Sequence, residues 1–108
     1  MKKWTPISLD ELNIEIQKGV QNMTNINCRT WNVISIKPEK WSEKNYGREG
    51  NGFWVVAIIN EKIIWYNDIE DGFNVSSFSK YGVIDEYSAE QDELEWTMNK
   101  LKRHYNIC

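Results

Sequence analysis

The stretch that decides the fold is FWVVAIINEKIIWY, residues 53–66. Residues 53–59 are apolar throughout, which is typical of a central strand covered on both faces. Asn60 and Glu61 follow, and a second apolar run begins at Lys62 and ends at Tyr66. Two polar residues between two apolar runs predict a tight antiparallel hairpin.

The sequence before this hairpin predicts one helix and one strand. Ser8 is followed three residues later by Glu11, which forms the capping-box pattern of a helix start. Apolar residues then recur at spacings of three and four, so we expect a helix near residues 8–23. Residues 30–36 favour a strand, and Pro38 is expected to stop it.

The sequence after the hairpin predicts a long connection, a strand and a helix. Residues 67–80 contain three acidic residues, three serines and one glycine, and they are expected to form the connection. Residues 81–87 are expected to form the fourth strand. Ser88 and Gln91 form a second capping-box pattern, so a helix is expected from there to about His104.

These elements predict an α+β fold in a single domain over residues 1–108. The order is helix, four-stranded antiparallel meander, helix, with the helices packed on the sheet. No apolar run approaches the roughly 20 residues that span a bilayer, and no apolar signal core follows the N-terminus. A cytoplasmic protein without a membrane segment is therefore expected.

The residues that bind metals and cofactors are scarce. The two cysteines, Cys28 and Cys108, form no zinc-binding pattern, and His104 is the only histidine. A calcium loop aligned on Gly72 would place Ile69 and Phe78 at ligand positions, so the EF-hand pattern fails. We expect no metal, no cofactor and no catalytic residues.

The net charge of −3 conceals an asymmetry between the two halves of the chain. Residues 1–54 carry 8 basic and 6 acidic side chains, whereas residues 55–108 carry 5 and 10. The charge is therefore +2 in the first half and −5 in the second. Such an acidic field attracts basic partners and repels the phosphate backbone of nucleic acids.

Large aromatic side chains accompany the acidic residues of the second half. Aromatic residues beside charged ones are typical of the hot spots of protein interfaces. The expected partner-binding residues are Trp65, Tyr66, Asp68, Glu70, Asp71, Asp85, Glu86, Glu90 and Trp96.

The acidic aromatic run from Trp65 to Asp71, together with the acidic run SAEQDE at residues 88–93, resembles bacterial immunity proteins in type. The resemblance implies a non-enzymatic protein that binds and neutralises a basic toxin, such as a nuclease. It transfers no binding residue by position.

Two other functions are compatible with the sequence. The first is a single-stranded nucleic-acid-binding protein that stacks bases on Trp31, Trp41 and Tyr46. The second is a small enzyme that uses carboxylates of the connection, in the manner of a glycosidase pair. A homodimer formed through exposed tryptophans is compatible with all three functions.

Overall fold

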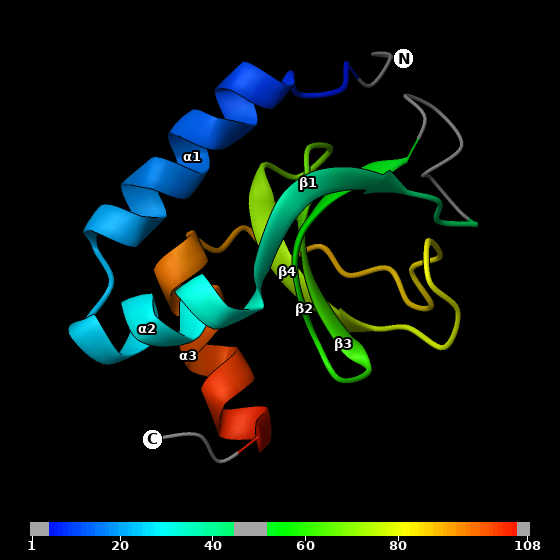
Figure 1. The fold of residues 1–108 in the computed structure, drawn as a ribbon. Helices are drawn as coiled ribbons and strands as arrows, with labels where there is room; N and C mark the ends of the chain where they lie inside the picture. Colours follow the sequence, from blue (N-terminus) through cyan, green and yellow to red (C-terminus); the bar gives the residue numbers. More distant parts are fainter. Residues whose placement is uncertain (1–4, 45–51, 106–108) are drawn as a thin grey trace.

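The computed structural model describes residues 5–44 and 52–105, and the side chains up to Arg103. The chain forms two helices, a four-stranded sheet and a third helix (Figure 1). The elements are α1 (Leu9–Gln21), α2 (Asn25–Ile34), β1 (Ser35–Trp41), β2 (Phe53–Ile59), β3 (Lys62–Asn67), β4 (Gly72–Ser77) and α3 (Leu94–Tyr105).

The sheet is an antiparallel meander with the order β1-β2-β3-β4. The sequence prediction of an α+β fold with helices packed on such a sheet is therefore confirmed. The hairpin that joins β2 and β3 pairs Ile59 with Lys62, so Asn60 and Glu61 form its turn, as expected. Asn60 has a φ of 51°, a left-handed conformation that asparagine tolerates better than most residues.

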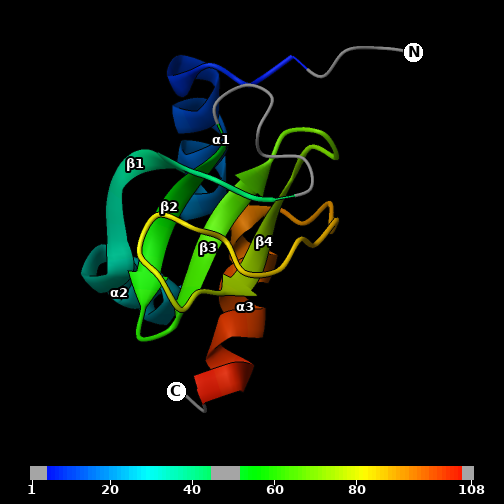
Figure 2. The same cartoon turned by 90° about the vertical axis from the view of Figure 1, so that its right-hand side faces the viewer.

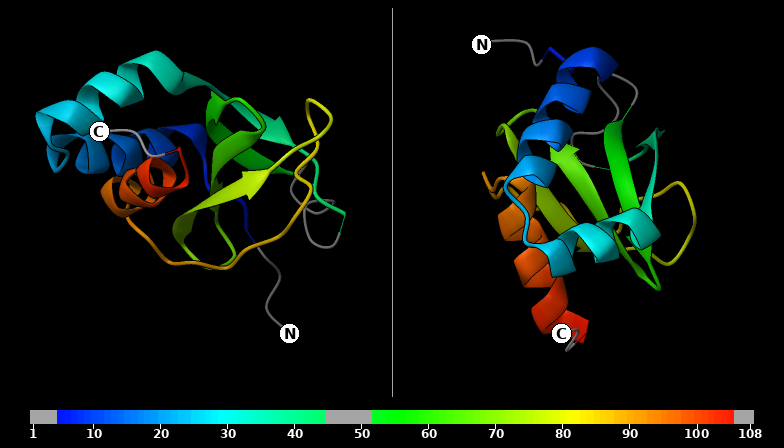
Figure 3. Two further views of the ribbon diagram at one scale, coloured as in Figure 1. Left: turned by 90° about the horizontal axis from the view of Figure 1, so that it is seen from below. Right: turned by 60° about the vertical axis from the view of Figure 1, so that its left-hand side comes forward.

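The two faces of the sheet are covered differently. The helices gather on one side, where Leu12, Trp31 and Met98 pack against β2 and β3 residues such as Ile64 (Figure 3). On the opposite side the segment after β4 crosses the sheet, and its Ile84 packs with the tryptophan and phenylalanine side chains of a second core (Figure 2). The central strands are thus covered on both faces, which explains their continuous apolar sequence.

A register shift in β2 adapts the strand to these two cores. Val55 belongs to the second core, whereas the consecutive residues Val56 and Ala57 both belong to the helix-facing core. The pairing of β2 with β3 shifts between Val55 and Ala57, as in a β-bulge. A bulge breaks the alternation of side chains and lets two neighbours point to one face.

The start of α1 is fixed by a capping box, and the helix packs closely on α3. Ser8 is the N-cap, and Ser8 and Glu11 form the reciprocal capping box that the sequence predicted. Leu12 and Gly19 are the buried residues of this helix, and Gly19 lies against Leu94 of α3. Because a Cβ at Gly19 would meet the Leu94 side chain, the two helices approach closely there.

The expected strand at residues 30–36 was wrong, because most of it belongs to α2. Thr24 caps this helix by accepting a hydrogen bond from the backbone N–H of Asn27. Asn27, Trp31 and Ile34 lie on its buried face. β1 begins at Ser35 and continues through Pro38, which is tolerated because β1 is an edge strand with an irregular register near the proline.

The expected connection at residues 67–80 and the strand at residues 81–87 were also wrong. β4 occupies Gly72–Ser77, so the connection from β3 shrinks to a four-residue turn, Asp68 to Asp71. Asn67 closes this turn, since its Oδ1 accepts hydrogen bonds from the N–H groups of Ile69 and Glu70. The second capping box is absent: the Ser88 hydroxyl donates to Asn74 instead, and α3 begins at Leu94.

The part of the chain that the structure describes contains no helix with the length and apolar character needed to cross a bilayer.

Candidate functional site

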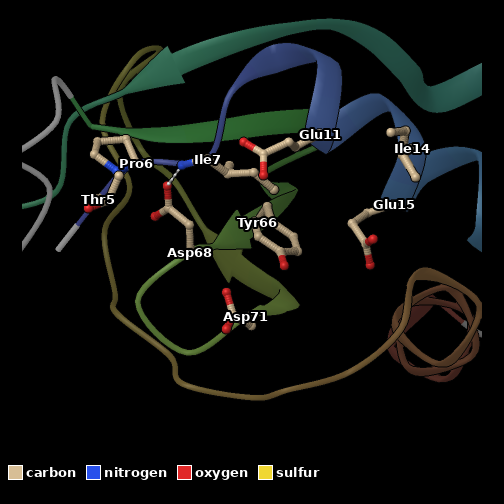
Figure 4. Close-up of a pocket in the computed structure, with 9 residues that line it drawn as sticks. All are labelled: Thr5, Pro6, Ile7, Glu11, Ile14, Glu15, Tyr66, Asp68 and Asp71. Atoms are coloured by element: carbon tan, nitrogen blue, oxygen red, sulfur yellow. Dashed lines mark hydrogen bonds between the residues drawn. The ribbon is translucent and has the colours of Figure 1, made fainter.

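A cleft lies between the start of α1 and the turn that joins β3 to β4. It has a volume of about 530 Å³ and nine lining residues (Figure 4). These residues are Thr5, Pro6, Ile7, Glu11, Ile14, Glu15, Tyr66, Asp68 and Asp71. Four of the nine are carboxylates and none is a lysine or arginine, so the walls are acidic.

The backbone of Ile7 holds the two sides of the cleft together. Its N–H donates to Oδ2 of Asp68 at 2.7 Å, and its carbonyl accepts from the indole N–H of Trp54 at 3.1 Å. The segment before α1 is therefore fixed over the ends of β2 and β3. This contact places the first turns of α1 opposite the β3–β4 turn.

The wall formed by α1 carries Glu11 and Glu15. Residues four apart lie on one face of a helix, so both carboxylates belong to the same wall. Glu11 takes part in the capping box through Oε1, which accepts from the N–H and hydroxyl of Ser8. Oε2 of Glu15 lies 3.2 Å from the ammonium of Lys18, which is a surface ion pair.

The opposite wall carries Asp68 and Asp71, at the two ends of the turn. Asp71 is exposed and has a φ of 59°, which aspartate tolerates because its short polar side chain suits the left-handed region. The turn thus presents two carboxylates within four residues. Figure 4 shows them on the side of Tyr66 opposite to α1.

Tyr66 of β3 lies at the base of the cleft, between the two walls. Its side chain is only 5% exposed, and its ring packs edge-on against Phe73 with centroids 4.9 Å apart. Burial first, and then the negative charges of Asp71, Glu15, Asp68 and Glu11, raise the pKa of Tyr66 to about 12. All four carboxylates therefore act on one phenol, which remains protonated at neutral pH.

One lysine lies near the Asp68 end of the cleft. The Lys40 ammonium is 4.9 Å from the centre of the Trp54 ring, and it donates to the carbonyl of Gly52. Burial lowers the pKa of Lys40, and the charge of Asp68 opposes this effect. The Asp68 end of the cleft is thus partly balanced by a cation of the chain itself.

The structure therefore brings together three of the residues expected from the sequence, Tyr66, Asp68 and Asp71. It adds Glu11 and Glu15, which the sequence reasoning missed. The four-residue spacing in the first turns of α1 was a visible signal that both lie on one helix face. The partner of that face was not visible, because it depends on how α1 packs on the sheet.

Trp65 was expected to contact a partner, and the structure places it in the second core instead. Its side chain is 0% exposed, and its indole N–H donates to the Ser76 hydroxyl at 2.8 Å. Its ring lies 4.8 Å from that of Phe53. Because side chains alternate along a strand, Trp65 and Tyr66 point to opposite faces of the sheet.

The other expected residues do not join the cleft. Glu70 lies in the same turn but does not line the cleft. Asp85, Glu86 and Glu90 follow the outer edge of β4, where Oε1 of Glu86 accepts from the N–H of Ser77. Trp96 lies on α3 and is 60% exposed. The acidic segments thus form two separate regions.

Two of the three aromatic residues expected to stack on nucleic-acid bases are buried. Trp31 is 7% exposed and Trp41 is 1% exposed, so neither offers a ring face for stacking. Tyr46 lies outside the described residues.

Within residues 5–44 and 52–105, no group of three or more His, Cys, Asp or Glu side chains is arranged to hold a metal ion. Comparisons of the chain with protein-family models, with curated proteins and with solved structures found no match. Function is therefore inferred from the cleft alone.

Proposed function

We propose that this chain is a non-enzymatic binding protein of the immunity type, which acts in the cytoplasm and neutralises a basic toxin such as a nuclease. The observation that supports this proposal is the convergence of four carboxylates, from two elements, on a cleft whose lining includes no cation. Such a surface is complementary to the basic surface with which a nuclease holds its substrate.

The binding surface that we propose differs from the one expected from the sequence. Its centre is the cleft, with Glu11, Glu15, Tyr66, Asp68 and Asp71. Trp65 is no longer part of it. Trp96, the exposed tryptophan of α3, is a second surface through which the protein could contact its partner or a second copy of itself.

Neither alternative function gains support from an observation. The stacking residues Trp31 and Trp41 are buried, which weighs against binding of single-stranded nucleic acid. For the enzyme, nothing in the described part of the chain singles out one pair of carboxylates as reactive.

The experiment that tests the proposal captures the partner with the wild type and with a neutralised cleft. The cleft variant is Glu11→Gln/Glu15→Gln/Asp71→Asn. Glutamine preserves the capping box at position 11, and asparagine tolerates the positive φ at position 71. Loss of three charges should weaken capture of a basic protein about 10- to 100-fold at low salt.

A matched variant controls for net charge. Glu61→Gln/Asp85→Asn/Glu90→Gln removes the same number of charges away from the cleft, and it should capture the partner within about twofold of wild type. The wild type and this control should also relieve the growth inhibition that the captured protein causes. Equal loss of capture in both variants would show only a general effect of net charge. It would refute the cleft as the binding site.

A further inference from the structure

The hydroxyl of Tyr66 is a polar group at the base of the cleft. Across residues 5–44 and 52–105 it makes no hydrogen bond, although the side chain that carries it is 5% exposed. Figure 4 shows the hydroxyl pointing into the cleft, toward the space between Glu15 and Asp71. The hydroxyl oxygen reaches the solvent of the cleft, and a phenol both donates and accepts hydrogen bonds. The group is therefore placed to meet a ligand.

The carboxylates near this hydroxyl keep acceptor capacity. Glu11 uses Oε1 in the capping box, and Glu15 uses Oε2 toward Lys18. Their second oxygens, and both oxygens of Asp71, make no hydrogen bond with the described part of the chain. Asp68, in contrast, is engaged by the N–H of Ile7 and lies near Lys40. The most acidic part of the cleft is thus the side around Tyr66.

We infer that this side of the cleft receives the guanidinium group of an arginine from the partner, and that the Tyr66 hydroxyl selects arginine over lysine. The inference rests on the proposed function, because it specifies the chemistry of the same cleft. A guanidinium presents five N–H donors in a planar fork, so it can reach carboxylates on both walls and the phenol oxygen between them. An ammonium is a compact charge with three donors and spans the cleft less well.

The apolar residues of the lining suit the stem of such a side chain. Pro6 and Ile14 lie at the cleft beside the acidic groups. Long basic side chains keep their methylene groups on apolar surface while the charged head contacts polar groups. The volume of about 530 Å³ leaves room for one extended side chain and the backbone next to it.

The test compares two blocked peptides, acetyl-Gly-Arg-Gly-amide and acetyl-Gly-Lys-Gly-amide, in titrations of the ¹⁵N-labelled protein at low salt. The arginine peptide should shift the amide signals of Glu15, Tyr66 and Asp71, with a Kd of roughly a millimolar. The lysine peptide should bind about 5-fold more weakly, which is the effect of one hydrogen bond.

Tyr66→Phe is the variant that isolates the hydroxyl, because it keeps the ring against Phe73. It should weaken the arginine peptide about 5-fold and leave the lysine peptide unchanged. Equal binding of both peptides in the cleft, insensitive to Tyr66→Phe, would overturn the selection of arginine and leave the proposed function standing. Absence of cleft shifts with either peptide would refute the acidic cleft as a binding site as well.

Discussion

Two acidic clefts in the described part of the chain differ in where the balancing positive charge comes from. The larger cleft, between α1 and the β3–β4 turn, has no cation among its lining residues. The smaller one, of about 180 Å³ between β4 and α3, is lined by Glu90, Asp92 and also Lys100. The Lys100 ammonium pairs with Asp92 and lies 3.8 Å from Glu90.

Acidic residues therefore have different roles in the two clefts. In the smaller cleft the hydrogen bond from Lys100 to Asp92 raises the pKa of the lysine, so the charges stabilise each other. In the larger cleft Glu15 pairs with Lys18, which lies outside the lining, whereas Glu11 and Asp71 form no ion pair with the described part of the chain. Acidic composition does not distinguish the two clefts, whereas the presence of a lysine among the lining residues does.

Asn74→Ala should have the largest effect on stability, because it removes hydrogen bonds that hold the walls of the smaller cleft together. The buried Asn74 side chain donates to the carbonyls of Gly72 and Glu90 and accepts from Ser88 and the Glu90 N–H. Removing it leaves buried polar groups unpaired, at a cost of about 3 to 4 kcal/mol of unfolding free energy. Urea denaturation measures this loss. A variant as stable as wild type would show that residues 88–90 are not held by Asn74.

The ionisation of Tyr66 should make the larger cleft sensitive to high pH. Its pKa rises from the ordinary value of 10.0 to about 12 in the folded protein. Between these pH values the unfolded chain has lost the proton and the folded chain still holds it, so stability falls as pH rises. The loss should reach about 2 to 3 kcal/mol by pH 12.

Tyr66→Phe is the control for this titration. Urea denaturation of both proteins across pH 9 to 12 should show a shallower fall for the variant, since the remaining tyrosines are shared. Parallel curves would mean that burial and the four carboxylates do not raise the pKa of Tyr66.

Lys100→Met should destabilise the protein by about 0.5 to 1 kcal/mol, because it removes the cation that balances Asp92 and Glu90 in a partly exposed setting. Lys102→Met is the matched control on the same helix, with an expected change within about 0.5 kcal/mol. Thermal or urea unfolding measures both. An equal loss in the two variants would contradict a special role for Lys100.

Asp71→Asn should have the smallest effect on stability and the opposite sign. It removes one of four like charges around the larger cleft, and asparagine tolerates the φ of 59°. We expect no loss, or a gain of up to about 0.5 kcal/mol, in urea denaturation. A clear loss of stability would mean that Asp71 is held by a favourable contact, which would make the two clefts alike.

The parts of the fold that follow local rules could be predicted from the sequence. The apolar hairpin of β2 and β3 and the capping box at Ser8 depend on neighbouring residues, and both are confirmed. α2 was missed because its apolar residues also fit the alternation of a strand. Its helical signals were the Thr24 cap and the three- and four-residue spacing of Asn27, Trp31 and Ile34.

β4 was missed because it buries polar groups. Asn74 and Ser76 are both buried, and the Ser76 hydroxyl accepts from Trp65 and donates to the carbonyl of Glu86. A hydropathy pattern predicts a loop for such polar residues. Their burial is compensated by hydrogen bonds that form only in the folded structure. The Asp71-Gly72 pair was a turn signal that could have indicated the hairpin.

Three of the five central residues of the candidate site could be predicted from the sequence, because they follow a local pattern. Tyr66, Asp68 and Asp71 are neighbours in the chain, so their proximity is local. Glu11 and Glu15 join them through tertiary contacts such as the hydrogen bond from the Ile7 N–H to Asp68, between residues 61 positions apart. Tertiary packing of this kind leaves no trace in local patterns.

The central claim is that the basic partner docks on the larger cleft and not on the edge of β4. The most direct test is chemical-shift mapping of the captured partner on the ¹⁵N-labelled protein. The cleft account predicts that the shifts centre on the first turns of α1 and on residues 66–71, while residues 85–92 remain unchanged. Shifts centred on residues 85–92 and Trp96, with α1 and the β3–β4 turn unaffected, would contradict it.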